Sequence, residues 1–148
     1  MFLARFGSID YNRNMNRQKF IILYIAPIFA WMGFIFLLST IPNLKSELPD
    51  LWDLILRKIA HLVEFGILAW LLARPIFPYG QKHKMPVWES ALTVIILAIL
   101  YAASDELHQT FVIGRTGSFW DVGIDGVGVV VGTYLYQRIF IDSKNQSQ

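Results

Sequence analysis

Long apolar runs separated by short polar stretches dominate the sequence. Four of them approach the roughly 20 residues that an α-helix needs to cross the hydrocarbon core of a bilayer. They span residues 20–41, 59–77, 87–103 and 122–141. This pattern predicts an all-α membrane protein, a bundle of about four transmembrane helices with little mass outside the bilayer.

Composition supports the same class of protein. The 148 residues are 55% hydrophobic and 16% charged, with a mean hydropathy of +0.45, which lies outside the usual balance of soluble domains. The sequence contains no cysteine, so disulfides, thiolate metal ligands and a cysteine nucleophile are excluded.

Basic residues divide unequally between the two sides of a four-span bundle. Of the 13 lysines and arginines, nine fall before the first run, within residues 74–86, or near the C-terminus, and the other four fall on the opposite side. Because Lys and Arg accumulate in cytoplasmic loops, we predict that both termini are cytoplasmic. The pI near 9.0 then reflects topology, and no nucleic-acid partner is expected.

Ionisable residues form three clusters at the edges of the apolar runs, all on the predicted extracytoplasmic side. Charge near a membrane core is costly, so such groups need partners and usually belong to a working site. The clusters are Lys58, His61 and Glu64; Asp105, Glu106, His108 and Gln109 with Arg115; and Asp121 and Asp125.

The first cluster precedes and enters the second apolar run. A helix that starts with Asp50 as its N-cap would place Lys58, His61 and Glu64 on one face about 120° wide. Glu64 would lie about 9 Å deeper than Lys58. Taken alone, Lys58 is typical of an interfacial lysine and His61 of a hydrogen-bonded core histidine, so a purely structural interpretation stays open.

The second cluster closes the third run. Asp105, His108 and Gln109 have the i, i+3, i+4 spacing of one helix face. A carboxylate at a helix C-terminus opposes the helix dipole, so we expect Asp105 to pair with Lys58 or Arg115. The carboxylate of Glu106, next to Asp105, could equally belong to a solvated helix end.

The connection between the third and fourth runs contains Gly114-Arg115-Thr116-Gly117. Such a turn can expose backbone N–H groups beside the guanidinium, which suits a phosphate or carboxylate. Because Arg115 lies in a glycine turn, we expect the scaffold to lose little when it is replaced by alanine.

The third cluster starts the fourth run. Ser118 as N-cap with Asp121 at the third helical position resembles a capping box, which would by itself account for Asp121. Asp121, Asp125, Gly128 and Gly132 fall within a stripe of about 60°. Because Gly128-x-x-x-Gly132 is a close-packing pattern of membrane helices, the aspartates are expected to point into the bundle.

Taken together, these motifs resemble the VanZ-like membrane proteins from about Arg57 to Gly132. The family usually has proline where this chain has Ile113, and often asparagine where it has Asp125. The matching residues are Lys58-x-x-His61, Asp105-Glu106-x-x-Gln109-x-Phe111, Gly114-Arg115 and Asp121-x-x-x-Asp125-x-x-Gly128.

The resemblance implies a small multi-pass protein of the bacterial inner membrane. It implies a cytoplasmic segment over residues 1–19, a VanZ-like helical domain over 20–141 and a cytoplasmic tail over 142–148. The family's namesake is associated with resistance to the glycopeptide teicoplanin, and the resemblance supplies no established reaction.

Two functions of different classes follow. In the first, the outer face binds membrane lipid, either an anionic lipid or a lipid-linked cell-wall precursor headgroup, and so influences glycopeptide susceptibility. Its ligand-binding residues would be Lys58, His61, Gln109 and Arg115.

In the second, the protein is a hydrolase or transferase acting on such a headgroup. His61 or His108 would be the general base, Arg115 would stabilise developing charge, and a carboxylate would orient the base. The candidate carboxylates are Asp105, Glu106, Asp121 and Asp125.

A divalent metal held by Asp and His is chemically conceivable. However, the spacing matches no motif such as H-E-x-x-H, so neither a metal nor another cofactor is expected. A structural role, in which ion pairs only lock the bundle, also stays open, whereas four spans leave little room for a transport pathway. The oligomeric state is left open.

Overall fold

A computed structural model of the chain describes residues 16–41, 50–113, 115 and 117–145. Within these residues every regular element is helical, which confirms the predicted all-α class. In chain order the elements are α2 (Arg17–Phe20), the π-helix η1 (Ile21–Ile25), α3 (Ala26–Thr40), α4 (Asp50–Lys82), α5 (Val87–Gln109) and α6 (Phe119–Asn145).

Three helical stretches of the described chain are long and apolar enough to cross a membrane: Arg17–Thr40, Ile55–Lys82 and Val87–Gln109. Helix α6 has 27 residues but is not among them, because its glycines and its charged residues lower its hydropathy. The protein is therefore an all-helical membrane protein. A fourth span and the cytoplasmic location of both termini stay predictions.

The helix bounds extend the predicted runs. Helix α4 begins at Asp50, although the side chain of Asp50, and with it the predicted N-cap, lies outside the described part. Helix α5 continues past residue 103 to Gln109 because the polar residues of its last turn are buried in the bundle rather than solvated. The four residues of the second cluster other than Arg115 therefore lie on the last turns of α5, as the helical spacing predicted.

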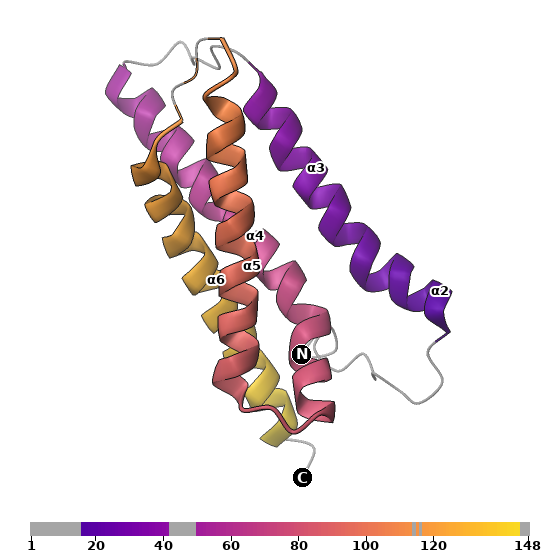
Figure 1. Cartoon of the computed structure of the whole chain (residues 1–148). Helices are drawn as coiled ribbons and strands as arrows, with labels where there is room; N and C mark the ends of the chain where they lie inside the picture. The colour runs from indigo at the N-terminus through magenta and orange to yellow at the C-terminus, as the bar shows by residue number, and fades with distance from the viewer. Residues whose placement is uncertain (1–15, 42–49, 114, 116, 146–148) are drawn as a thin grey trace.

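Helices α4, α5 and α6 pack against one another, and α3 packs against α4 and α5. In Figure 1, α3 (indigo) lies at the edge of the bundle. The ends of α3 and α5 and the starts of α4 and α6 all lie toward the top of that view. Residues far apart in the sequence are thereby brought to one end of the bundle, which we call the site end.

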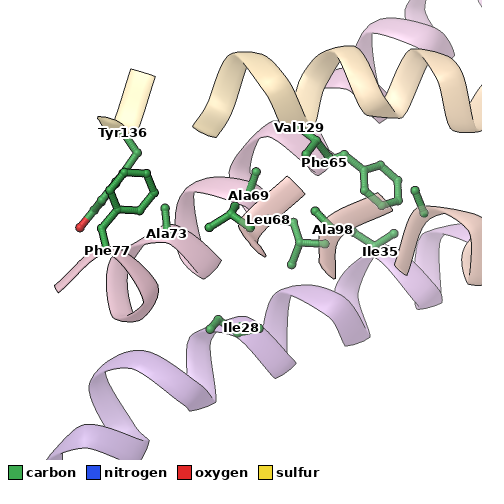
Figure 2. Close-up of a cluster of buried hydrophobic side chains, with 12 residues drawn as sticks. Ile28, Ile35, Phe65, Leu68, Ala69, Ala73, Phe77, Ala98, Val129 and Tyr136 are labelled. Carbon is green, nitrogen blue, oxygen red and sulfur yellow. The ribbon is translucent and has the colours of Figure 1, made fainter. Parts of the chain in front are cut away.

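The hydrophobic core lies where α3, α4, α5 and α6 meet. Ile35 of α3, Phe65 and Leu68 of α4, Ala98 of α5 and Val129 of α6 are all inaccessible to solvent and surround one another in Figure 2. Large apolar side chains also cover much of the outer surface, as expected where helices face lipid.

Helices α4 and α6 are in backbone contact. A Cβ atom added to Gly128 would overlap the carbonyl oxygen of Leu62, and one added to Gly132 would overlap that of Gly66. Small residues let membrane helices approach this closely. The two glycines therefore fix how near α6 lies to α4, on the face that also carries the aspartates.

Candidate functional site

Two polar contacts join α4 to α6 at the site end. The ammonium of Lys58 forms an ion pair with the carboxylate of Asp121, and Nδ1 of His61 lies 3.3 Å from Oδ1 of Asp125. Lys58 and His61 are three residues apart on α4, and Asp121 and Asp125 are four apart on α6. Each pair of residues occupies one helix face, so the two faces match.

Burial increases steeply from the first contact to the second. The side chains of Lys58 and Asp121 are 32% and 22% exposed, whereas those of His61 and Asp125 are 16% and 1% exposed. The outer pair can therefore be reached by a ligand, and the inner pair is nearly closed off from solvent.

Asp105 is held by neutral donors rather than by a cation. Its Oδ2 accepts a hydrogen bond from Ser39 Oγ at 2.8 Å and another from Gln109 Nε2 at 2.9 Å. The expected ion pair of Asp105 with Lys58 or Arg115 is not formed, because α3 places Ser39 against α5 at this level. Gln109, a predicted ligand-binding residue, is buried and engaged with Asp105.

Glu106 fixes the start of α6. Its Oε2 accepts a hydrogen bond from the backbone nitrogen of Ser118 at 2.9 Å, and the residue is only 4% exposed. The solvated helix end considered for Glu106 is therefore wrong. Ser118 Oγ does accept from Trp120 N, at 3.2 Å. However, the reciprocal bond of a capping box comes from Glu106, since Asp121 is bound to Lys58.

Arg115 reaches the end of α3. Its Nε donates to the carbonyl oxygen of Ile41 at 3.2 Å and its Nη2 to that of Leu38 at 2.9 Å. Leu38 lies in the last turn of α3 and Ile41 directly follows the helix, a region where backbone acceptors lack their full set of helical partners. Arg115 thus caps α3, a structural role that the glycine turn did not indicate. Gly114 and Thr116 lie outside the described part.

The loop beside Arg115 approaches the end of α5 closely. A Cβ atom on Gly117 would overlap the backbone carbonyl oxygen of Glu106. Glycine at this position therefore allows the chain to pass α5 and deliver the Ser118 nitrogen to the Glu106 carboxylate.

His108 and Glu64 lie apart from the two α4–α6 contacts. The His108 ring stacks on Phe36 of α3 with centroids 4.3 Å apart, and its Nε2 lies 3.4 Å from Thr40 Oγ1. His108 therefore faces α3 and not the carboxylates of α6. Glu64 is partly buried, one turn along α4 from His61, within electrostatic range of His61 and Arg115.

The residue that sequence reasoning missed is Ser39. Ser39 is 3% exposed, and its hydroxyl connects α3 to α5 by donating a hydrogen bond to Asp105. Ser39-Thr40 are the polar residues that end the otherwise apolar first run. That signal, at the same predicted membrane level as the three clusters, could have identified it.

Three side chains at the site end could ligate a metal ion. His61, Glu106 and Asp125 come from α4, α5 and α6, and each offers one ligand atom within 4.8 Å of the others. The structure thus brings together Lys58, His61, Glu106, Asp121 and Asp125, and holds Asp105, His108, Gln109 and Arg115 in contacts of their own with α3.

Comparison with known proteins extends the resemblance beyond its motifs. The model of the VanZ/LLP1 family matches residues 2–141, which adds the first apolar run to the region where the motifs lie. No curated protein and no solved structure matches the chain. With nearly the whole of its length covered by the family model, the chain belongs to the VanZ/LLP1 family.

Proposed function

We propose that this membrane protein binds the headgroup of an anionic lipid, or of a lipid-linked cell-envelope precursor, at the site end of the bundle. The observation that carries the proposal is that Lys58 and Arg115 both lie at this end while neither is fully buried. We further propose, from the asymmetry of basic residues, that the site end is extracytoplasmic.

Arg115 is suited to anion binding because its fixed partners do not neutralise it. Backbone carbonyls hold Nε and Nη2 in place but carry no net charge, so the guanidinium keeps its positive charge in a defined orientation. Nη1 takes part in neither bond. Pre-organised N–H donors of a guanidinium favour phosphate and carboxylate groups.

Lys58 supplies the second cation when a ligand phosphate replaces Asp121 as its partner. Its partner Asp121 is a single carboxylate that is 22% exposed, and a solvent-accessible ion pair of this kind contributes only about 0–1 kcal/mol. A phosphate that reaches Lys58 can therefore replace Asp121 at small cost. His61 and Gln109 lie deeper and would support the site without forming its rim.

The resemblance to the VanZ-like proteins adds a cellular consequence. A protein that occupies the headgroup of a cell-wall precursor would alter how a glycopeptide antibiotic engages the bacterial surface. We therefore include altered teicoplanin susceptibility in the proposal, as its expected phenotype in bacteria.

Capture of labelled lipids by the purified protein tests the proposal. Phosphatidylcholine nanodiscs containing phosphatidylglycerol or undecaprenyl diphosphate provide the two sources of an anionic headgroup. We expect preferential capture of one of them, weakened several-fold by Lys58→Gln. The matched control is Lys82→Gln, at the opposite end of α4, which should capture as the parent does. Equal capture by the parent, Lys58→Gln and Lys82→Gln would overturn the proposal.

The buried pair of His61 and Asp125 favours a second candidate function. An imidazole next to a carboxylate is the arrangement of a general base whose orientation is fixed by an acid, and Nδ1 of His61 lies 3.3 Å from Asp125 Oδ1. We therefore propose, as the alternative, hydrolysis of the phosphoanhydride bond of a lipid-linked diphosphate, with water as the nucleophile and phosphate as the leaving group.

Phosphate release from undecaprenyl diphosphate separates the two functions. A hydrolase should turn over repeatedly and should lose its activity in His61→Asn. In Lys58→Gln we expect a higher substrate concentration at half-maximal rate. A parent protein that captures the lipid and releases no phosphate excludes the hydrolase and leaves headgroup binding in place.

A further inference from the structure

A group of buried polar atoms at the site end makes no hydrogen bond of good geometry within the described residues. Both carboxylate oxygens of Asp125, Oε1 of Glu106 and Nδ1 of His61 are buried and make no hydrogen bond within the described residues. Asp125 is 0% exposed and Glu106 is 4% exposed. A buried polar group left without a partner costs about 1–3 kcal/mol, and more when it is charged.

These atoms converge on one point. The ligand atoms of His61, Glu106 and Asp125 all lie within 4.8 Å of one another, although the residues come from three helices. Two carboxylates this close repel each other when both are ionised. Two neighbouring cations are engaged with other groups, since Lys58 pairs with Asp121 and Arg115 binds backbone carbonyls.

We propose that His61, Glu106 and Asp125 form a binding site for one divalent transition-metal ion. Two carboxylates with a neutral imidazole balance a charge of +2, which suits a site of low dielectric constant. The metal would also give each orphaned atom a partner. The proposal does not depend on headgroup binding, because none of the three residues forms the proposed anion-binding rim.

The geometry needs only a small adjustment. Atoms that bind one ion at about 2.0–2.2 Å lie roughly 3–3.5 Å apart. The His61 Nδ1 to Asp125 Oδ1 distance is already 3.3 Å, so Glu106 must move its free oxygen Oε1 inward. Its other oxygen stays on the Ser118 nitrogen, which orients the carboxylate as outer hydrogen bonds commonly orient metal ligands.

The donor set indicates which metals fit. Imidazole nitrogen suits Zn²⁺ and other transition metals, carboxylate oxygens also suit Mn²⁺, and Mg²⁺ and Ca²⁺ prefer oxygen ligands alone. One nitrogen with two carboxylates therefore favours Zn²⁺ or Mn²⁺ over Mg²⁺ and Ca²⁺. Three protein ligands also leave at least one coordination position for a water or another oxygen.

Direct titration of the metal tests this inference. The protein is purified in detergent, freed of any affinity tag, stripped with EDTA, desalted and titrated calorimetrically with ZnCl₂ or MnCl₂. We expect one equivalent to bind saturably and to raise the melting temperature, with weaker binding of Mg²⁺ and Ca²⁺. Loss of a ligand in His61→Asn or Asp125→Asn should weaken binding at least about tenfold, since even loss of an outer partner costs that much.

Two further measurements keep the test decisive. His83→Asn changes an exposed histidine just beyond α4 and should bind like the parent. If Asp125→Asn does not fold, Glu106→Gln takes its place, because the amide oxygen can still accept from Ser118. Mn²⁺ bound to the parent should show imidazole nitrogen hyperfine coupling in pulsed paramagnetic resonance, and His61→Asn should lack it. Absence of binding by the parent, or equal binding by His61→Asn, overturns the proposal.

Discussion

Oε2 of Glu106 accepts a hydrogen bond from the backbone nitrogen of Ser118 at 2.9 Å, so α6 begins on a carboxylate that belongs to α5. The first backbone N–H groups of a helix lack acceptors within that helix. An anion is therefore favourable at a helix N-terminus. One carboxylate oxygen therefore fixes the entry of the chain into α6, while the other is buried without a hydrogen-bond partner among the described residues.

Glu106 should be separable into these two roles by substitution. Glu106→Ala removes the acceptor and should lower the free energy of unfolding by about 1–3 kcal/mol. Glu106→Gln keeps an acceptor for Ser118 and removes the charge, so it should retain most of the stability in the presence of EDTA. Thermal unfolding in detergent measures both, and an equal loss in the two variants would contradict the capping role.

Lys58 and Asp121 should show a modest coupling energy. Their side chains are partly exposed, and pairs of this kind contribute about 0.2–1 kcal/mol, with more expected as burial increases. A double-mutant cycle with Lys58→Met and Asp121→Asn isolates the pairwise energy. We expect about 0.2–1 kcal/mol, and a coupling of zero would show that the contact does not stabilise the bundle.

Arg115→Ala should destabilise the protein more than its glycine-rich surroundings indicate. It removes both hydrogen bonds to the carbonyls at the end of α3, for which we expect a loss of about 1–3 kcal/mol. Arg115→Lys keeps the charge but reaches fewer acceptors, so it should recover anion capture more fully than stability. Melting temperature and lipid capture, measured on the same samples, distinguish these effects. If Arg115→Ala melts like the parent, Arg115 does not cap α3 in solution.

The membrane orientation gives an independent prediction. Nine of the 13 basic residues lie on the side that contains both termini of a four-span bundle, so that side should be cytoplasmic. A reporter fused at the C-terminus should be active in the cytoplasm, and one inserted between residues 42 and 50 should be active outside it. The reverse result would place Lys58 and Arg115 on the cytoplasmic side. They could then not reach a cell-wall precursor that has been exported to the outer face of the membrane.

Helix periodicity made the α4–α6 contacts predictable in outline. Lys58 and His61 share a face, as do Asp121 and Asp125, and the glycine stripe indicated that the aspartates point into the bundle. The sequence alone could not pair them, because pairing depends on the relative height of two helices. That height is determined by packing between Gly128 and Leu62, residues far apart in the chain.

The contacts with α3 could not be predicted for a different reason. Arg115 binds backbone carbonyls, which every residue possesses and no sequence pattern reveals. Asp105 binds Ser39, whose hydroxyl reaches it only because α3 packs at one level on α5. Glu106 accepts the hydrogen bond from the Ser118 backbone nitrogen, which the local spacing had assigned to Asp121. In each case a long-range contact replaced the partner that was nearest in the sequence.

Gly128 and Gly132 have a mechanical consequence for the pair that lies next to them. Side chains at an interface can yield by changing rotamer, but main-chain atoms already in contact cannot move closer. Asp125 is about one helical turn, roughly 5 Å, from Gly128. The glycine contact therefore sets the closest approach of α6 to α4 beside Asp125 and His61, and no change of rotamer elsewhere in the interface can shorten it.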